Sequence, residues 1–135
     1  MRTSGHKVLV TGGSAGIGFA LAREFRERDN QVVICGRSAE RLAEAARQIP
    51  GVHTVQCDIS DDRDLRRLVE TAVAKLGGLS LLVNNAGIQL NYSLADVEPE
   101  TALRDIDAEI AVNLAAQAKL TALCLPLLRR EDPSA

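Results

Sequence analysis

Two kinds of segment alternate along the chain. Short runs of consecutive apolar residues recur, as in "VLV", "VVI" and "LLV", and longer segments follow them in which apolar residues return every three or four positions. Continuous apolar runs are typical of parallel strands that are buried on both faces, whereas the longer spacing is typical of helices. The runs predict four strands, at 7–11, 31–35, 53–57 and 80–84.

Four helices are predicted between and after these strands, at 16–29, 38–49, 61–76 and about 100–128. In the first helix, the apolar residues expected to share one face are Ile17, Ala20, Leu21 and Phe25. In the last helix, apolar residues recur at the same spacing: Leu103, Ile106, Ile110, Leu114 and Leu120.

Polar and glycine residues mark the expected ends of these helices. Ser38 and Ser60 are predicted N-caps, because a hydroxyl oxygen accepts a hydrogen bond from a free N–H of the first turn. Gly77 and Gly78 are expected to end the third helix. The polar tail 129–135, which contains a proline, predicts a surface loop or a frayed end.

The order of elements predicts an α/β fold. Strands that alternate with helices indicate a parallel sheet with helices on both faces, and right-handed crossovers favour an open, doubly wound sheet. We expect the strand order 3-2-1-4 in one domain over residues 1–135. Ligands of such sheets bind beyond the carboxyl ends of the strands, where the strand order reverses. The segments 12–18 and 84–87 should therefore meet at one crevice.

Composition narrows the possible partners. The net charge is −2, no basic run is present and aromatic residues make up 2% of the chain, which argues against a nucleic-acid-binding surface. Cys35, Cys57 and Cys124 lack metal-binding spacing, so they predict buried thiols with no metal site and no disulfide framework. No secretory leader is apparent, and no apolar run approaches the roughly 20 residues that span a bilayer. A cytoplasmic location without membrane contact is therefore expected.

A glycine-rich loop, "TGGSAGIG", joins the first strand to the first helix. Gly12 would allow a tight turn, Gly16 would let the backbone approach a pyrophosphate, and Gly18 would let the helix pack closely on the strand. The helix N-terminus near Ile17 offers free N–H groups to a phosphate. The alternative is a turn without a ligand.

Four motifs together resemble the short-chain dehydrogenase/reductase family: "TGGSAGIG" at 11–18, "CDI" at 57–59, "NNAG" at 84–87 and Asn113 within "AVNL". The resemblance covers essentially the whole chain, which corresponds to the N-terminal half of a family member. Within the family, "NNAGIQ" is most similar to the bacterial DltE-like reductases. The resemblance implies a Rossmann-like fold, a nicotinamide cofactor and hydride transfer to or from a carbonyl or alcohol carbon.

The resemblance also assigns roles to individual residues. The loop glycines, with the backbone of Ser14 and Ile17, would hold the pyrophosphate of NAD(P). Asp58 and Ile59 would flank the adenine. The residues implied at the adenosine ribose and the fourth strand are Asn84, Ala86 and Gly87.

Asn113 matches the active-site asparagine of the family, which holds a water molecule between the catalytic lysine and the proton relay. Judged from the residues alone, two of these assignments have structural alternatives. Asp58 could belong to the N-cap region of the next helix, and Asn113 could be a polar residue satisfied beneath the sheet.

The choice between NAD and NADP can be argued from charge. Enzymes that prefer NAD usually carry an acidic residue at the end of the second strand, where it binds the ribose hydroxyls. This position holds "CGRS", with Arg37 and Ser38 and no carboxylate. A guanidinium suits the 2′-phosphate, so NADP(H) is the expected cofactor and NAD is disfavoured. The alternative for Arg37 is a solvated surface arginine.

The catalytic residues of the family are absent from the 135 residues. Family members use a tyrosine as general acid and base, a lysine four residues later that lowers its pKa, and a serine that orients the substrate. Tyr92 is the single tyrosine here, and Asp96 stands four residues after it. We expect a cofactor-binding part that is inactive alone, with truncation, proteolysis and a naturally short chain all left open. The substrate is not indicated.

Self-association is expected through one of two surfaces. The fourth strand would be an unpaired apolar edge, and such edges tend to pair with other chains. The resemblance implies that the helix at 100–128 packs against a partner subunit. Two alternatives to an oxidoreductase stay open: a non-catalytic NADP(H)-binding module and an assembly module.

Overall fold

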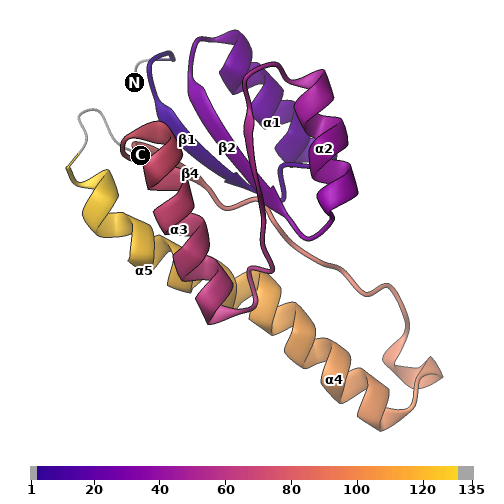
Figure 1. The fold of residues 1–135 in the computed structure, drawn as a ribbon. Coiled ribbons are helices and arrows are strands. Elements are labelled where there is room, and N and C mark those ends of the chain that lie inside the picture. The colour runs from indigo at the N-terminus through magenta and orange to yellow at the C-terminus, as the bar shows by residue number, and fades with distance from the viewer. Residues whose placement is uncertain (1–2, 131–135) are drawn as a thin grey trace.

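The computed structural model describes residues 3–130, so the tail predicted at 129–135 lies mostly outside the described part. A four-stranded parallel sheet forms its centre, with the order β3-β2-β1-β4 and helices on both faces (Figure 1). The predicted doubly wound α/β fold and its strand order are confirmed. The strands are β1 (Lys7–Thr11), β2 (Gln31–Gly36), β3 (His53–Gln56) and β4 (Leu81–Val83).

All four predicted helices are present. The first three are α1 (Gly16–Glu27), α2 (Ala39–Gln48) and α3 (Asp62–Leu76). The fourth runs without a break from Pro99 to Leu128, but it contains a π-helical segment that was not predicted. Its parts are α4 (Pro99–Ile110), η2 (Ala111–Ala116) and α5 (Gln117–Leu128), and a short 3₁₀ turn, η1 (Leu94–Asp96), precedes them.

The core lies on both faces of the sheet, because alternate side chains of each buried strand point to opposite sides. On one face, Leu9 and Val33 pack with residues of α3 and α5 such as Leu68 and Leu120. The residues that pack on the other face come from β1, β2, α1 and α2: Val10, Ile34, Ala22 and Leu42. This double burial explains why the strands read as continuous apolar runs.

The buried face of α1 matches the predicted one only in part, because Phe25 packs against the core as predicted but other residues of the predicted face do not. Ile17 is 75% exposed and Ala20 is also exposed, whereas Gly18 and Ala22 are buried. The helix approaches the sheet so closely that its contact positions hold the smallest side chains. Apolar periodicity therefore misplaced the face by about one residue.

Two of the three predicted helix boundaries are confirmed. The Ser38 hydroxyl accepts from the Arg41 N–H at 3.2 Å, and Gly77 ends α3 in the left-handed conformation with φ 68°. The prediction for Ser60 is wrong. Asp61 is the N-cap of α3, because its carboxylate accepts from the N–H groups of both Arg63 and Asp64 at 2.9 Å.

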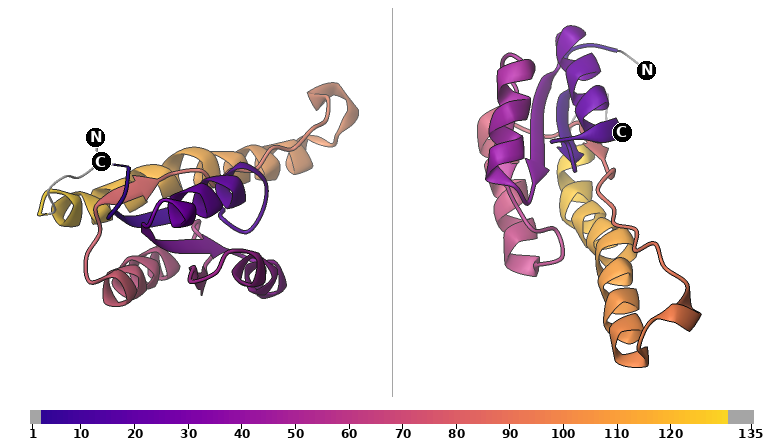
Figure 2. Two further views of the ribbon diagram at one scale, coloured as in Figure 1. Left: turned by 90° about the horizontal axis from the view of Figure 1, so that it is seen from above. Right: turned by 90° about the vertical axis from the view of Figure 1, so that its right-hand side faces the viewer.

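The last helix has two different environments along its length. α5 lies against the sheet, with Leu120, Cys124 and Leu128 buried, whereas α4 projects beyond the sheet (Figure 2). Four apolar side chains on the projecting part are 42–66% exposed: Leu103, Ile106, Ile110 and Leu114. We call these four residues the apolar stripe.

By length and composition alone, Pro99–Leu128 is long and apolar enough to cross a membrane, with a mean hydropathy of 1.4 in its most apolar window. This helix differs from the sequence-based expectation, which was that no apolar run approaches the roughly 20 residues that span a bilayer. Such a test is also passed by helices in protein cores. Two polar contacts tie this helix to the rest of the fold: Gln117 donates to the Ala86 carbonyl at 2.9 Å, and Lys119 pairs with Asp62 at 2.8 Å.

Candidate functional site

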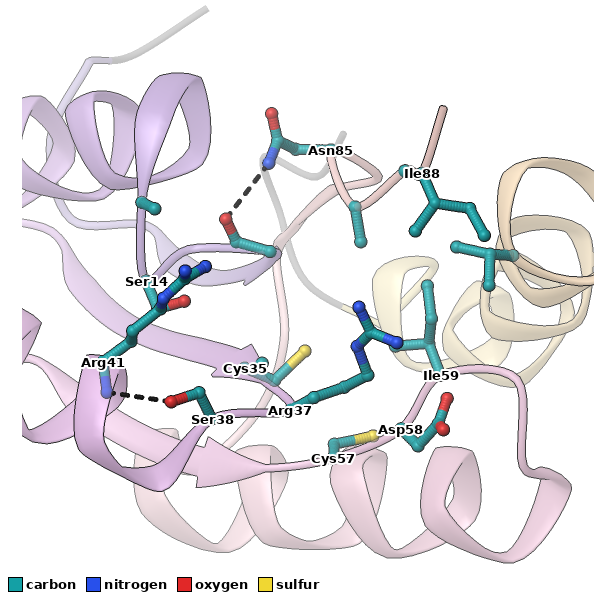
Figure 3. Close-up of a pocket in the computed structure, with 16 residues that line it drawn as sticks. Ser14, Cys35, Arg37, Ser38, Arg41, Cys57, Asp58, Ile59, Asn85 and Ile88 are labelled. Atoms are coloured by element: carbon teal, nitrogen blue, oxygen red, sulfur yellow. Dashed lines mark hydrogen bonds between the residues drawn. The ribbon is translucent and has the colours of Figure 1, made fainter. Parts of the chain in front are cut away.

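A cavity of about 360 Å³ opens at the carboxyl ends of the strands, where the loops after β1 and β4 meet (Figure 3). This is the predicted crevice at the reversal of strand order. The residues singled out from the sequence that line it are Gly12, Ser14, Arg37, Ser38, Asp58, Ile59, Ala86 and Gly87. Those that do not line it are Gly16, Ile17, Gly18, Asn84 and Asn113.

The three loop glycines meet different physical requirements. Gly12 has φ +65°, which side-chain-bearing residues rarely adopt. A Cβ on Gly18 would lie 2.4 Å from the Gly12 carbonyl oxygen and from Nδ2 of Asn85, so only glycine fits there. Gly16 also has a positive φ, of +56°, but a Cβ there would meet no atom within 4 Å. Its backbone therefore stays open to a ligand.

The N-terminus of α1 has no side-chain cap. Ser38 and Asp61 cap α2 and α3, but Ala15 precedes α1 without a capping hydrogen bond, and the first turn holds no acidic residue. The backbone N–H groups of the first turn, including those of Gly16 and Ile17, therefore lack a side-chain partner. Free N–H groups at a helix start bind anions. Ile17 would contribute through its backbone, because its side chain faces outward.

Thr11 and Asn85 join the two loops that border the cavity. The buried Thr11 hydroxyl accepts from the N–H groups of Asn85 and Ala86, both at 3.0 Å. Asn85 in turn donates to the Thr11 carbonyl at 3.0 Å and to the Gly12 carbonyl at 3.3 Å. Asn85 was not predicted as a site residue. Asn84 was, and its side chain donates to Thr121 on α5 at 2.9 Å. The sequence feature that could have identified Asn85 is the pair of asparagines directly after the fourth strand.

Asn113 lies in the π-helical segment and faces the loop after β4. Its Nδ2 donates to the Ile88 carbonyl at 2.7 Å, and its Oδ1 accepts from the Ile88 N–H at 2.8 Å. A Cβ on Gly87 would come within 3.3 Å of the same Oδ1. Both polar atoms of Asn113 are therefore satisfied by protein, as in the structural alternative, but the residue is exposed and faces the loop after β4 and does not lie beneath the sheet. π-helical turns occur frequently at functional sites.

Two arginines line one side of the cavity. Arg37 follows β2 and Arg41 lies in the first turns of α2, and both side chains are drawn reaching into the crevice in Figure 3. Within residues 3–130, no carboxylate pairs with either guanidinium. Arg41 was not predicted, although its position three residues after the N-cap Ser38 places it at the same end of the sheet.

Asp58 lines the cavity and also orders the turn before α3. Its Oδ1 accepts from the N–H of Ser60 at 3.0 Å and from the Ser60 hydroxyl at 2.7 Å. The Asp58 N–H donates to Asp64 at 2.9 Å. This hydrogen bond and the neighbouring Arg67 guanidinium lower the pKa of the Asp64 carboxyl.

Tyr92 lies outside the cavity, in the segment that runs out beside α4 (Figure 1). Its hydroxyl donates to Oδ2 of Asp105 at 3.1 Å. Loss of hydration and this hydrogen bond raise the pKa of Tyr92. In the described part of the chain, no three His, Cys, Asp or Glu side chains are placed to hold a metal ion.

Comparisons with known proteins agree with this geometry. The family model of the short chain dehydrogenases matches residues 6–134. The chain is 43% identical over its whole length to an uncharacterized oxidoreductase, DltE, of Bacillus subtilis, of which it covers 53%. It is 36% identical over 96% of its length to an L-fucose dehydrogenase of Bos taurus, of which it covers 47%.

A solved structure shows the same fold. The 3-ketoacyl-(acyl-carrier-protein) reductase of Brucella melitensis, complexed with NADH, superposes with a TM-score of 0.85 over 96% of this chain and 52% of that protein, at 30% identity. The chain thus spans about half the length of the relatives that it matches. It belongs to the short-chain dehydrogenase family of oxidoreductases, whose members bind a nicotinamide cofactor.

Proposed function

We propose that this chain binds NADP(H) in the crevice and forms the cofactor-binding part of an oxidoreductase that acts on a carbonyl or alcohol carbon. The observation that carries the choice of NADP(H) is that Arg37 and Arg41 line the cavity beside the N-cap Ser38, and that neither has a carboxylate partner within residues 3–130. Two guanidinium groups without acidic partners form a site for a dianionic 2′-phosphate. A relative from Lentilactobacillus kefiri, 39% identical over 102 residues, is an NADP-dependent alcohol dehydrogenase.

The rest of the crevice fits a dinucleotide. The uncapped α1 N-terminus and the open space at Gly16 suit a pyrophosphate, which needs free N–H groups and close backbone approach. Asp58 and Ile59 also line the cavity, and an adenine would lie against them. The remaining residues that we assign to the cofactor site are Gly12, Ser14, Gly18, Asn84, Ala86 and Gly87. Bound NADPH would supply the hydride.

Asn113 is the residue that we assign to the active site. It holds the backbone of Ile88, which lines the cavity, and so fixes the edge of the crevice from the side of the long helix. Its role in this chain would be to position that edge.

Equilibrium titration with NADPH and NADH tests the cofactor assignment. The wild type should bind NADPH more tightly than NADH. Arg37→Ala should cost about 1.5–3 kcal/mol of NADPH binding free energy, the range for hydrogen bonds to charged groups, and should leave NADH binding unchanged. Arg63→Ala, which removes an arginine outside the cavity, is the matched control. Equal affinity for the two cofactors would overturn the proposal.

A second candidate function is NADP(H) binding without turnover. It is favoured by Tyr92, which is bound to Asp105 and has Asp96 in place of the lysine four residues later. An assay of NADPH oxidation with small aldehydes and ketones separates the two functions. Turnover by this chain would exclude the non-catalytic module, and cofactor binding without turnover would support it. Absence of cofactor binding would leave an assembly role.

We also propose that two copies associate through the apolar stripe, which lies on α4 and η2. One helix that projects beyond the sheet cannot cover its own apolar side, and a second stripe would cover it. The resemblance to the family points to the same helix. Since the three cysteines of the chain are free thiols, we propose that the protein is located in the reducing cytoplasm.

A further inference from the structure

We propose that the open edge of β4 binds a strand of a second polypeptide, of the kind that forms the rest of the longer relatives, and that this polypeptide completes one side of the crevice. Binding at the edge does not depend on the proposed function. What the second polypeptide adds to the crevice rests on the proposed function.

The two edges of the sheet differ in character. Within residues 3–130, β4 has β1 on one side and no strand on the other, and β3 is likewise an edge strand. An edge strand presents a row of backbone N–H and C=O groups with which a further strand can pair. Three of the four residues of β3 are polar, and Arg67 donates to the Gln56 carbonyl at its end at 2.8 Å. All three residues of β4 are apolar, so this edge is the one suited to a further strand.

The side chains of β4 are covered less well than those of the strand beside it. Leu9 and Val10 are fully buried, whereas their partners in β4, Leu82 and Val83, are half-buried. Leu82 packs against the core on the α3 and α5 face, and Val83 packs against the core on the α1 and α2 face. Both faces of the sheet are therefore incompletely covered at this edge. The occupant that fits is a strand with packed elements of its own, which a short peptide lacks.

The longer relatives indicate what kind of polypeptide this is. The reductase of Brucella melitensis contains the same fold, with a TM-score of 0.85, and this chain covers 52% of it. DltE of Bacillus subtilis is matched over 53% of its length at 43% identity. In both relatives, nearly half of the polypeptide therefore lies outside the shared part. The part of DltE that this chain does not match is the occupant that we assign to the β4 edge.

A second copy of this chain is the competing occupant. Pairing of β4 with β4 across a two-fold axis would be antiparallel, and it would join only three residues from each side. Such a pair would leave Leu82 and Val83 covered by equally short strands. A folded polypeptide that brings its own strand and packed elements would bury more of this apolar surface.

A strand added to β4 would end at the crevice. All strands of the described sheet are parallel, and the carboxyl ends of parallel strands lie at one edge. A fifth parallel strand would therefore end beside the segment after β4, where Ala86, Gly87 and Ile88 line the cavity. Tyr92, the single tyrosine of the chain, lies outside the cavity. The polypeptide that follows the added strand is thus placed to supply the general acid for carbonyl reduction.

Coexpression tests the docking directly. The full chain, carrying an affinity tag, is produced together with the part of Bacillus subtilis DltE that it does not match, and native mass spectrometry reports the composition of the purified material. One copy of each polypeptide is expected. Hydrogen exchange should slow at backbone amides of β4 in the complex and stay unchanged at those of β3. Absence of the DltE part, or protection confined to elements other than β4, would overturn the proposal.

A lysine at the edge separates this surface from others. Val83→Lys should weaken the complex about tenfold or more, because its charge would be buried among side chains of the added polypeptide. Thr54→Lys is the matched control, since Thr54 is also half-buried but lies on β3 at the opposite edge, and it should leave the complex unchanged. Should Val83→Lys fail to fold, hydrogen exchange of the wild type still decides. Unchanged affinity of a folded Val83→Lys protein, or protection of β4 by a second copy of this chain, would contradict the proposal.

Turnover tests what the second polypeptide adds to the crevice. The complex should oxidise NADPH in the presence of small aldehydes or ketones, whereas the chain alone should not. A complex that binds NADPH without turnover would overturn the contribution to the crevice, while the docking at β4 would stand. A complex that forms without binding NADPH would instead contradict the proposed function.

Discussion

The amide of Asn113 binds both backbone polar groups of Ile88, donating to its carbonyl at 2.7 Å and accepting from its N–H at 2.8 Å. An amide can do this because it carries a donor and an acceptor side by side. The contact joins the π-helical segment to the loop after β4, residues that lie 25 positions apart. It is one of the bonds that hold the edge of the crevice in place.

Asn113→Ala should lower the free energy of unfolding by about 1–2 kcal/mol, since two partly exposed hydrogen bonds are lost. Asn113→Asp should recover only part of this loss, because a carboxylate can accept from the Ile88 N–H but cannot donate to its carbonyl. Urea denaturation measures both variants. Asn91→Ala is the control, because Asn91 lies in the exposed segment after β4 that also contains Ile88. It should change stability by less than about 0.5 kcal/mol. An equal loss in both alanine variants would contradict the role given to the amide.

Thr11→Val keeps the shape of a buried side chain but removes its hydroxyl. The N–H groups of Asn85 and Ala86 would then lose their acceptor, at a cost of about 2–4 kcal/mol in the free energy of unfolding. Thr11→Ser retains the oxygen and should lose clearly less. Chemical denaturation of the three proteins checks the order. A serine variant less stable than the valine variant would show that packing of the methyl group matters more than the hydrogen bonds.

Gly16 and Gly77 allow stability to be separated from ligand binding. Both have positive φ, of +56° and +68°, and at both a Cβ would meet open space. Gly16→Ala and Gly77→Ala should therefore each lose about 1–2 kcal/mol of stability from backbone strain alone. Only Gly16→Ala should also weaken NADPH binding, because its methyl group would stand where the pyrophosphate approaches. Titration and denaturation of both variants test this, and equal NADPH affinities would argue against a phosphate at Gly16.

Acid should weaken the turn that borders the crevice. The Asp58 N–H and Arg67 lower the pKa of Asp64 in the folded state, so this carboxylate stabilises the fold above its unfolded-state pKa of about 3.9. Its contribution is lost as the pH falls through the lowered folded-state value. Asp64→Asn should flatten the decline of stability below about pH 4. Glu70→Gln makes the same charge change on α3, and an identical pH profile for the two variants would reject this explanation.

Charged residues in the apolar stripe should separate the proposed dimer. Sedimentation analysis should show a dimer for the wild type and a monomer for the double variant Ile106→Glu, Ile110→Glu. Arg104→Glu, whose side chain is 72% exposed on the same helix, should stay dimeric. A dimer that survives the double substitution would point instead to the open edge of β4. A monomeric wild type would exclude both surfaces.

Much of this fold can be predicted because its signals are local. Runs of consecutive apolar residues identified β1, β2 and β4, and the Rossmann-type handedness then determined the order of the strands. The glycine positions followed from the same logic, since Gly12 and Gly18 meet requirements of the backbone that hold wherever such a loop occurs.

What the sequence-based prediction got wrong or left out, such as the cap at Asp61 and the role of Asn85, depends on geometry between neighbouring residues. Ser60 and Asp61 can both cap a helix, and only the path of the chain decides which oxygen reaches the first turn. Asn84 and Asn85 are chemically identical, and their different partners follow from the direction in which each side chain leaves the strand.

The π-helical segment Ala111–Ala116 lies between two parts of one continuous helix: α5, which packs on the sheet, and α4, which projects beyond it. A π-type turn accommodates one more residue than an α-helical turn, and each added residue rotates everything beyond it by about 100°. Deletion of a single residue there would turn the three stripe residues on α4, Leu103, Ile106 and Ile110, by roughly that angle while α5 stayed packed on the sheet. In evolutionary terms, a one-codon change at this position could exchange the surface that α4 offers to a partner without altering any residue of the core.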